Sequence, residues 1–198
     1  SAEITLTCPA DHESLNIVIP IPKKRFYYNR KINCLPAQGW IQYGDIHETL
    51  SPDSSLGQLD WGRGVWDYSS FWLWASASGF LADGRWVGLN LGRGFGDTTQ
   101  ATENAFILDG RLHKLDQVTI DYDPQDFMKP WIFRDNEGRL ELVMTPFKER
   151  LATTKLGIID SEVHQMFGHY AGRVVSDEGE EFQIAGLIGF AEEHYARW

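Results

Sequence analysis

The chain has 198 residues, which is enough for one large β domain with its own hydrophobic core. Its 28 Asp and Glu residues outnumber its 18 Lys and Arg residues, and the net charge of −10 argues against nucleic acid and anionic lipid surfaces as partners. No apolar run approaches the roughly 20 residues of a membrane span, and the N-terminus lacks a charged start followed by an apolar block. We therefore expect a water-soluble, cytoplasmic protein.

The two cysteines, Cys8 and Cys34, lack the repeated spacing of a disulfide framework or a zinc site. We expect free thiols in a reducing compartment, and neither a metal nor a cofactor. The chain begins Ser-Ala-Glu without Met and enters a strand-like stretch at 4–7 almost at once, as a fragment of a longer protein would. A targeting signal upstream would then be invisible.

β signals recur along the chain as short alternating or β-branched and aromatic runs between turn residues, whereas helical periodicity is scarce. Asp83-Gly84 and Asp109-Gly110 readily adopt the positive φ angles of a tight turn, and each predicts a hairpin. The predicted strands cover 4–7, 15–20, 25–28, 40–46, 71–81, 85–91, 104–108, 111–115, 117–122, 131–134, 139–145, 151–159, 163–175 and 181–190, and a short helix is predicted around 192–197.

This run of consecutive strands predicts an all-β protein. It favours a closed up-and-down antiparallel barrel of the lipocalin-like (calycin) type, because closure removes the sheet edges that would invite aggregation. We expect residues 1–198 to form one such domain. The chain is also rich in rings, with eight Trp, eleven Phe and seven Tyr, which favours an aromatic-lined cavity inside the barrel.

A basic cluster at 23–25 and 30–31 interrupts the acidic background. It lies among Pro20, Pro22 and aromatic residues, and we interpret it as a solvated loop. It does not by itself indicate a nucleic-acid-binding surface.

The segment 59–66 brings an acid, a guanidinium and two indoles together, with glycines that permit bends. We interpret it as a site loop in which Asp60 and Arg63 orient the polar end of a ligand, while Trp61 and Trp66 wall a cavity. The alternative is structural: Asp60 and Arg63 pair with each other and the indoles pack in the core.

In the predicted strand around 70–78, alternation places Trp72 and Trp74 on one face with serine hydroxyls, and leaves the other face purely apolar. A face of large rings and small hydroxyls is typical of the inside of a ligand-holding barrel, where rings supply area and hydroxyls fix orientation. We therefore expect Trp72 and Trp74 to point inward. The alternative is that they are ordinary core residues or cover the outside of the barrel.

The Gly-rich run at 92–97 superficially resembles a phosphate-binding loop. The third glycine of a dinucleotide fingerprint is replaced by Asp97, and no helical pattern follows to supply an N-terminal dipole. We expect a flexible loop at the rim of the barrel.

Glu103 and Asn104 introduce a carboxylate and an amide at the start of an apolar strand, and Glu103 shares parity with Ala105. Glu103 can therefore point inward. Burial beside indoles would favour its protonated form and allow general acid or base catalysis. Paired with Arg63 or Arg93 it would be structural instead.

His164 and His169 suggest a metal site, but their odd separation in a strand sends them to opposite faces. A bulge at Gly168 could bring them together. Because no cluster of Cys and His occurs elsewhere, we expect no metal. His164 remains a candidate ligand-binding residue.

Several separated motifs, in order along 24–198, resemble a bacterial family defined by a domain of unknown function (DUF2804). The resemblance implies a relation to the lipocalin-like group that contains hydroxyneurosporene synthase, a carotenoid hydratase, whose members fold as two successive β-barrels. This chain would then be the C-terminal barrel of a longer protein, with strands in 1–50 that complete a missing N-terminal barrel. The motifs are LDWGRGVW, GLNLG, ATENAF, LDGRL, MTPFKER, VHQMFG and the closing GFAEEHYARW.

Two functions are compatible with the sequence. The first is non-catalytic binding of a small apolar, terpenoid or lipid-like molecule, walled by the four indoles named above and oriented by Asp60, Arg63 and Asn104. The second is a cofactor-independent hydratase or cyclase acting on an unsaturated lipid-like substrate, with Glu103 or Asp60 as proton donor and indole faces that stabilise the developing cation. A third possibility is a filled barrel that acts through its acidic surface, with the missing domain or a second copy as partner.

Overall fold

The computed structural model describes residues 1–197, whose regular elements are all β-strands in two antiparallel sheets. The all-β fold class is therefore confirmed. The five-stranded sheet contains β1 (Ala2–Leu6), β2 (Leu15–Ile21), β3 (Arg25–Tyr43), β4 (Ile46–Leu50) and β5 (Leu56–Val65). The nine-stranded sheet contains β6 (Ser69–Phe80), β7 (Trp86–Arg93), β8 (Ala105–Leu108), β9 (Arg111–Lys114), β10 (Val118–Asp121), β11 (Trp131–Asp135), β12 (Leu140–Leu156), β13 (Ile159–Val175) and β14 (Glu181–Arg197).

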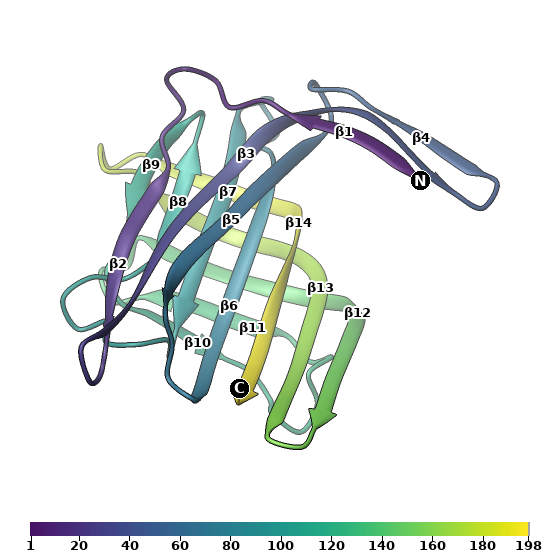
Figure 1. Cartoon of the computed structure of the whole chain (residues 1–198). Coiled ribbons are helices and arrows are strands. Elements are labelled where there is room, and N and C mark those ends of the chain that lie inside the picture. The colour runs from purple at the N-terminus through teal and green to yellow at the C-terminus, as the bar shows by residue number, and fades with distance from the viewer. Residues whose placement is uncertain (198) are drawn as a thin grey trace.

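The nine-stranded sheet curls into a half-barrel (Figure 1). Its strand order is β10-β11-β12-β13-β14-β6-β7-β8-β9, so β14 at the end of the chain pairs with β6 and joins two meanders. The lipocalin-like curvature expected from the sequence is confirmed. The expected closure is corrected, because within residues 1–197 the edge strands β9 and β10 are not paired with each other.

The concave side of the half-barrel is a hydrophobic core. Its cluster of buried side chains draws on strands from both ends of the sheet, including Phe133 and Met144 on one wing and Leu89 on the other. Phe133 is fully buried and its ring lies 5.5 Å from that of Tyr170, centroid to centroid. The start of β12 shows how alternation builds this core, with every second residue buried over 140–146.

β6 turns its apolar face, not its ring-and-hydroxyl face, into the half-barrel. Leu73, Ala75 and Ala77 are buried in the concave core, so alternation directs Trp72 and Trp74 to the convex side. This corrects the expectation that the two indoles point inward. The purely apolar face gains more from burial in the core, and the convex side is covered by a second sheet that can pair polar groups.

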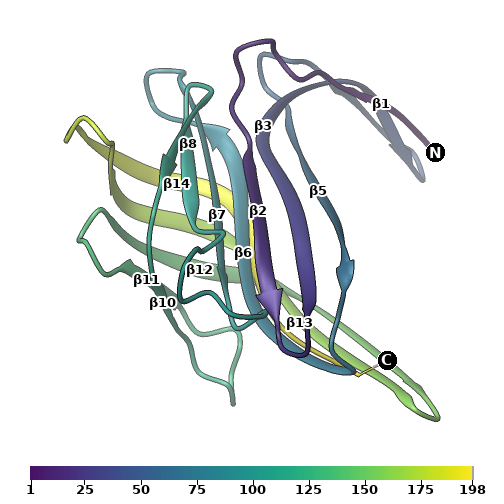
Figure 2. The same ribbon diagram turned by 60° about the vertical axis from the view of Figure 1, so that its left-hand side comes forward.

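The five-stranded sheet lies across the convex side of β6 and β7, and Figure 2 shows the two layers together. β3 is its long central strand, with β1 and β2 along one edge and β4 and β5 along the other. The layers meet at Asn33, whose Nδ2 donates to Ser76 Oγ at 2.9 Å and to the carbonyl of Leu89 at 3.1 Å. Gly88 permits this approach, since a Cβ there would lie 2.7 Å from both Asn33 Cβ and Cys34 Sγ.

Local differences from the predicted elements follow from pairing. The predicted helix at 192–197 is the end of β14, which is hydrogen-bonded to β13 on one side and to β6 on the other. The segment 59–66, predicted as a loop, lies mostly in β5, which pairs with β3. Ladder bonds on neighbouring strands outweigh local preferences in both places. Predicted strands also merge into longer ones: 25–28 joins most of 40–46 in β3, and 139–145 joins most of 151–159 in β12.

Candidate binding site between the two sheets

A cavity of about 130 Å³ lies between the two sheets, and we call it the intersheet pocket. β3 and β5 contribute residues from the five-stranded sheet, and β6 and β14 contribute residues from the half-barrel. The loop after β5, the loop after β7 and the segment before β8 add one residue each, namely Trp66, Phe95 and Glu103. The lining residues are Tyr27, Lys31, Asp60, Trp66, Trp72, Trp74, Phe95, Glu103 and Glu192.

Aromatic rings form much of the pocket lining, and they support one another. Phe95 lies edge-on to Tyr27, with 5.1 Å between ring centroids, and edge-on to Trp72 at 5.4 Å. Trp66 packs against Tyr27 at 5.6 Å. These contacts fix the rings around a shared space without requiring a ligand to order them.

An ammonium group connects the two sheets inside the pocket. Lys31 is 5% exposed, and its Nζ lies 2.8 Å from Asp60 Oδ1 and 3.7 Å from Glu103 Oε2. The same Nζ lies 4.0 Å from the centroid of the Trp74 ring, in a cation–π contact. Asn29 Nδ2 donates a further hydrogen bond to Glu103 Oε2 at 3.2 Å. The two carboxylates compensate the charge of Lys31, which makes its burial possible.

A third carboxylate, Glu192 of β14, faces the pocket from the half-barrel. It is 5% exposed, and it accepts hydrogen bonds from Trp72 Nε1 at 3.2 Å and from Gln165 Nε2 at 2.8 Å. Burial raises the pKa of Glu192, while these two hydrogen bonds act in the opposite direction. Glu192 is therefore held closer to its protonated form than an exposed glutamate. Burial likewise raises the pKa of Tyr27, which keeps its phenol protonated.

Hydrogen bonds and one glycine fix the positions of Trp74 and Glu103. Trp74 Nε1 donates to Asn90 Oδ1 at 2.8 Å, and Asn90 Nδ2 donates to the backbone carbonyl of Glu103 at 2.7 Å. The Glu103 carboxyl lies directly against Gly92, where a Cβ would come within 2.3 Å of Glu103 Oε1. Gly92 is therefore required for the observed place of this carboxylate.

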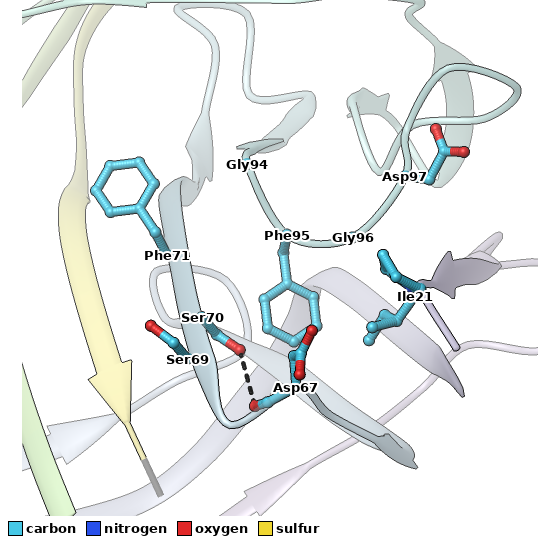
Figure 3. A pocket seen from close by; sticks show the side chains of 10 residues that line it. Ile21, Asp67, Ser69, Ser70, Phe71, Gly94, Phe95, Gly96 and Asp97 are labelled. Carbon is cyan, nitrogen blue, oxygen red and sulfur yellow. Dashed lines mark hydrogen bonds between the residues drawn. The ribbon is translucent and has the colours of Figure 1, made fainter. Parts of the chain in front are cut away.

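A second cavity of about 260 Å³ adjoins the intersheet pocket, and Phe95 lines both. Figure 3 shows the Phe95 side chain reaching from its loop toward Asp67 and Ile21. Gly94 and Gly96 flank Phe95 and both have positive φ angles, of 94° and 70°. The loop expected at 92–97 is thus present from Gly94 onward, and it serves to insert one ring between the two cavities.

The intersheet pocket gathers several of the residues that the sequence singled out. Asp60 comes from β5 and is paired with Lys31 rather than with Arg63. The others reach the same space from segments far apart in the chain. The predicted residues that line the pocket are Asp60, Trp66, Trp72, Trp74 and Glu103.

Trp61 and Arg63 lie outside the pocket. Both alternate with Asp60 along β5 and so point to the opposite face of the five-stranded sheet. There Trp61 is 48% exposed and packs edge-on against Tyr28, with 5.7 Å between ring centroids. Neither side chain contributes to the lining.

Asn104 and His164 also lie elsewhere. Asn104 is buried, and its side chain accepts a hydrogen bond from the backbone N–H of Gly92 and donates one to the carbonyl of Asp116, which is a structural role. His164 belongs to the concave side of the half-barrel, where its ring stacks on Phe127 with 4.1 Å between centroids. The sequence order of these residues gave no indication of which side of the sheet they face.

Four pocket residues were not among those predicted from the sequence. Lys31 was interpreted as part of a solvated loop, and Glu192 as part of a short helix. The alternation of Asn29, Lys31 and Asn33, three polar residues buried on one face of β3, is the signal that could have identified Lys31. The remaining two, Tyr27 and Phe95, carry no comparable signal.

The described residues show no group of three or more His, Cys, Asp or Glu side chains arranged to hold a metal ion. Residues 1–197 also contain no helix long and apolar enough to cross a membrane.

Comparison with known protein families identifies the family of this chain. The family model for the domain of unknown function DUF2804 matches residues 1–198. The chain belongs to the DUF2804 family. No curated protein and no solved structure matches it. The relation of the DUF2804 family to the hydroxyneurosporene synthase group stays a prediction from resemblance.

Proposed function

We propose that this DUF2804 protein binds a small, largely apolar organic molecule in the intersheet pocket. The observation that carries the proposal is the convergence of five aromatic side chains on one hollow, from β3, the loop after β5, β6 and the loop after β7. Ligand sites in proteins combine apolar and aromatic walls with a few placed polar groups. Asp60, Glu103 and Glu192 supply those polar groups.

The size of the pocket limits what enters it. About 130 Å³ accommodates about four water-sized groups, at roughly 30 Å³ each. A compact molecule, or the end of a longer one, fits this space. The adjoining cavity beyond Phe95 offers room for the remainder of a longer terpenoid or lipid-like ligand.

Isothermal titration calorimetry of the purified protein tests the proposal. The ligands are geraniol, a medium-chain fatty acid, indole and a small alkylammonium salt. Trp66→Ala removes one wall of the pocket and should weaken binding about tenfold, as expected for loss of an aromatic contact. Trp61→Ala is the matched control, because Trp61 lies on the opposite face of the same sheet, and it should leave the affinity unchanged. Equal effects of the two variants, or no binding of any ligand, would remove the proposal.

A second candidate function is acid-catalysed hydration of an unsaturated substrate, and the position of Glu192 favours it. Asp60 and Glu103 are both engaged in the ion pair with Lys31. Glu192 is buried, is held toward its protonated form and contacts an indole N–H. We therefore propose Glu192 in place of Asp60 or Glu103 as the acid in this reaction.

In this reaction the carboxyl proton of Glu192 passes to one alkene carbon, and the π electron pair forms the new C–H bond. Water adds to the cationic carbon and returns one proton to the carboxylate, so the net reaction is the addition of water. Indole faces would stabilise the cation. Glu192→Gln should abolish formation of the hydrated product (a diol) from geraniol, measured by gas chromatography. Glu193→Gln, on the opposite face of β14, is the control and should leave product formation unchanged.

A further inference from the structure

We propose that the ligand of the intersheet pocket is a cation, namely a small alkylammonium group; the inference rests on the proposed binding function. Four features carry it: the ring faces, the charge of the lining, a carboxylate without an ion pair and a buried amide oxygen without a donor.

The pocket already holds one ammonium group against its rings. Lys31 Nζ lies 4.0 Å from the centroid of the Trp74 ring and 2.8 Å from Asp60 Oδ1. This is the arrangement by which aromatic cages bind ammonium ligands, in which the negative ring face attracts the charge and a carboxylate completes the shell. Trp72 and Tyr27 provide further rings around the remaining space.

The charge of the lining excludes anions. The pocket contains three carboxylates, from Asp60, Glu103 and Glu192, and one ammonium group. Its charge is therefore negative whether or not Glu192 carries a proton. A carboxylate or phosphate ligand would meet repulsion in a partly desolvated site, where charge interactions are stronger than in water. A cation would meet attraction.

Glu192 is the carboxylate that lacks a counter-ion. Lys31 is paired with Asp60 and Glu103, whereas the two hydrogen-bond donors to Glu192, Trp72 and Gln165, are neutral. Within residues 1–197, no Lys or Arg forms an ion pair with it. A buried carboxylate of this kind is costly unless it takes up a proton or a cation compensates its charge. An alkylammonium group in the pocket would do so.

A fully buried hydrogen-bond acceptor, Asn29 Oδ1, lacks a donor. Asn29 lies between Tyr27 and Lys31, both of which line the pocket, and alternation gives the three side chains the same orientation. Its Nδ2 is used by Glu103, while its Oδ1 has no hydrogen-bond partner. The amide orientation is fixed, because a flip would set Oδ1 against the Glu103 carboxylate. A protonated amine brings N–H donors that a hydrocarbon lacks.

A charge-matched pair of probes tests the inference in the wild-type protein. tert-Butylammonium and tert-butanol have the same shape and about five heavy atoms each, which suits a pocket of about four water-sized groups. Tetramethylammonium is a third probe of similar size without N–H donors. Binding is followed through the indole N–H signals of Trp72 and Trp74 in ¹H–¹⁵N NMR spectra, assigned with Trp→Phe variants, and the exposed indole of Trp61 is the internal control.

We expect both cations to shift the pocket indoles with affinities on the order of 1 mM and to bind at least about tenfold more tightly than tert-butanol. Glu192→Gln, which keeps the shape of the side chain, should weaken the cations about tenfold and leave tert-butanol unchanged. If tert-butanol binds as tightly as the cations, the pocket is an apolar site, and this inference fails while the proposed function stands. If none of these probes and none of the neutral ligands shifts the pocket indoles, the proposed function fails as well.

Discussion

Replacing Lys31 with Met tests how far the polar cluster between the sheets depends on one ammonium group. Met retains much of the side-chain length but removes the charge, so Glu103, at 8% exposure, loses its ion pair. Removal of one partner from a buried pair costs about 3–5 kcal/mol. The side chain of Asp60 is 38% exposed and can be hydrated, so it adds little. With the cation–π contact to Trp74 included, we expect the free energy of unfolding to fall by about 4 kcal/mol.

Urea unfolding followed by circular dichroism measures this loss. Arg173→Ala is the control, since Arg173 and Glu181 form a solvent-exposed pair at 3.3 Å whose removal should cost less than about 1 kcal/mol. Adding Glu103→Gln to Lys31→Met should recover at least about 1 kcal/mol, because a neutral amide needs no counter-ion. A loss below about 1 kcal/mol for Lys31→Met, with no recovery in the double variant, would refute the desolvated ion pair.

Three further predictions concern the core, the pocket wall and pH. Phe133→Ala should lower the free energy of unfolding by about 3–5 kcal/mol in urea titrations, because Phe133 is fully buried in the concave core; a loss below about 1 kcal/mol would contradict that core. Gly92→Ala should cost about 1–3 kcal/mol and weaken ligand binding in calorimetry, because its Cβ would displace the Glu103 carboxyl; unchanged affinity would show that Glu103 is not needed in place. Burial lowers the pKa of His194 from 6.5 to about 4, so its contribution to stability is fully present above pH 6.5 and is lost as the pH falls toward 4. After allowance for partial exposure, that loss of stability is about 1–2 kcal/mol. It is measured as the change in the midpoint of urea unfolding between pH 6.5 and 4. An equal change in wild type and His194→Gln would exclude this role of His194.

The sequence identified the composition of the site better than its location. Charge beside indole marked Asp60 and Trp66, and rings alternating with hydroxyls marked Trp72 and Trp74. The structure brings these four residues together. Alternation correctly separated the two faces of β6, but it could not say which face the half-barrel would enclose. That choice depends on which face gains more from burial against β7 and β11–β13, and on whether a second layer covers the other face. Neither is encoded within one strand.

Lys31 and Glu192 show why the remaining pocket residues could not be predicted from the sequence. Each acquires its role through a partner more than 25 residues away in the chain, Lys31 with Asp60 and Glu192 with Trp72. Local composition made Lys31 part of a basic cluster and Glu192 part of a charged terminal segment. Only the crossing of β3 over β6, and the pairing of β14 with β6, place both groups in one cavity.

The strand boundaries illustrate the same limit. The hairpin turn at Asp83-Gly84 was predicted from its dipeptide alone and lies between β6 and β7, because a tight turn is a local property. The long strands β3 and β12 were predicted as separate pieces, since their continuity comes from several partners along their length.

The position of a bound ligand tests the central claim most directly. A crystal structure of the protein with the tightest ligand from the calorimetric panel should show that ligand between the sheets, in contact with Trp72 and Trp74 and within reach of Glu192. Density for the ligand on the concave side of the half-barrel, or on the outer face of β5 beside Trp61, would contradict the account.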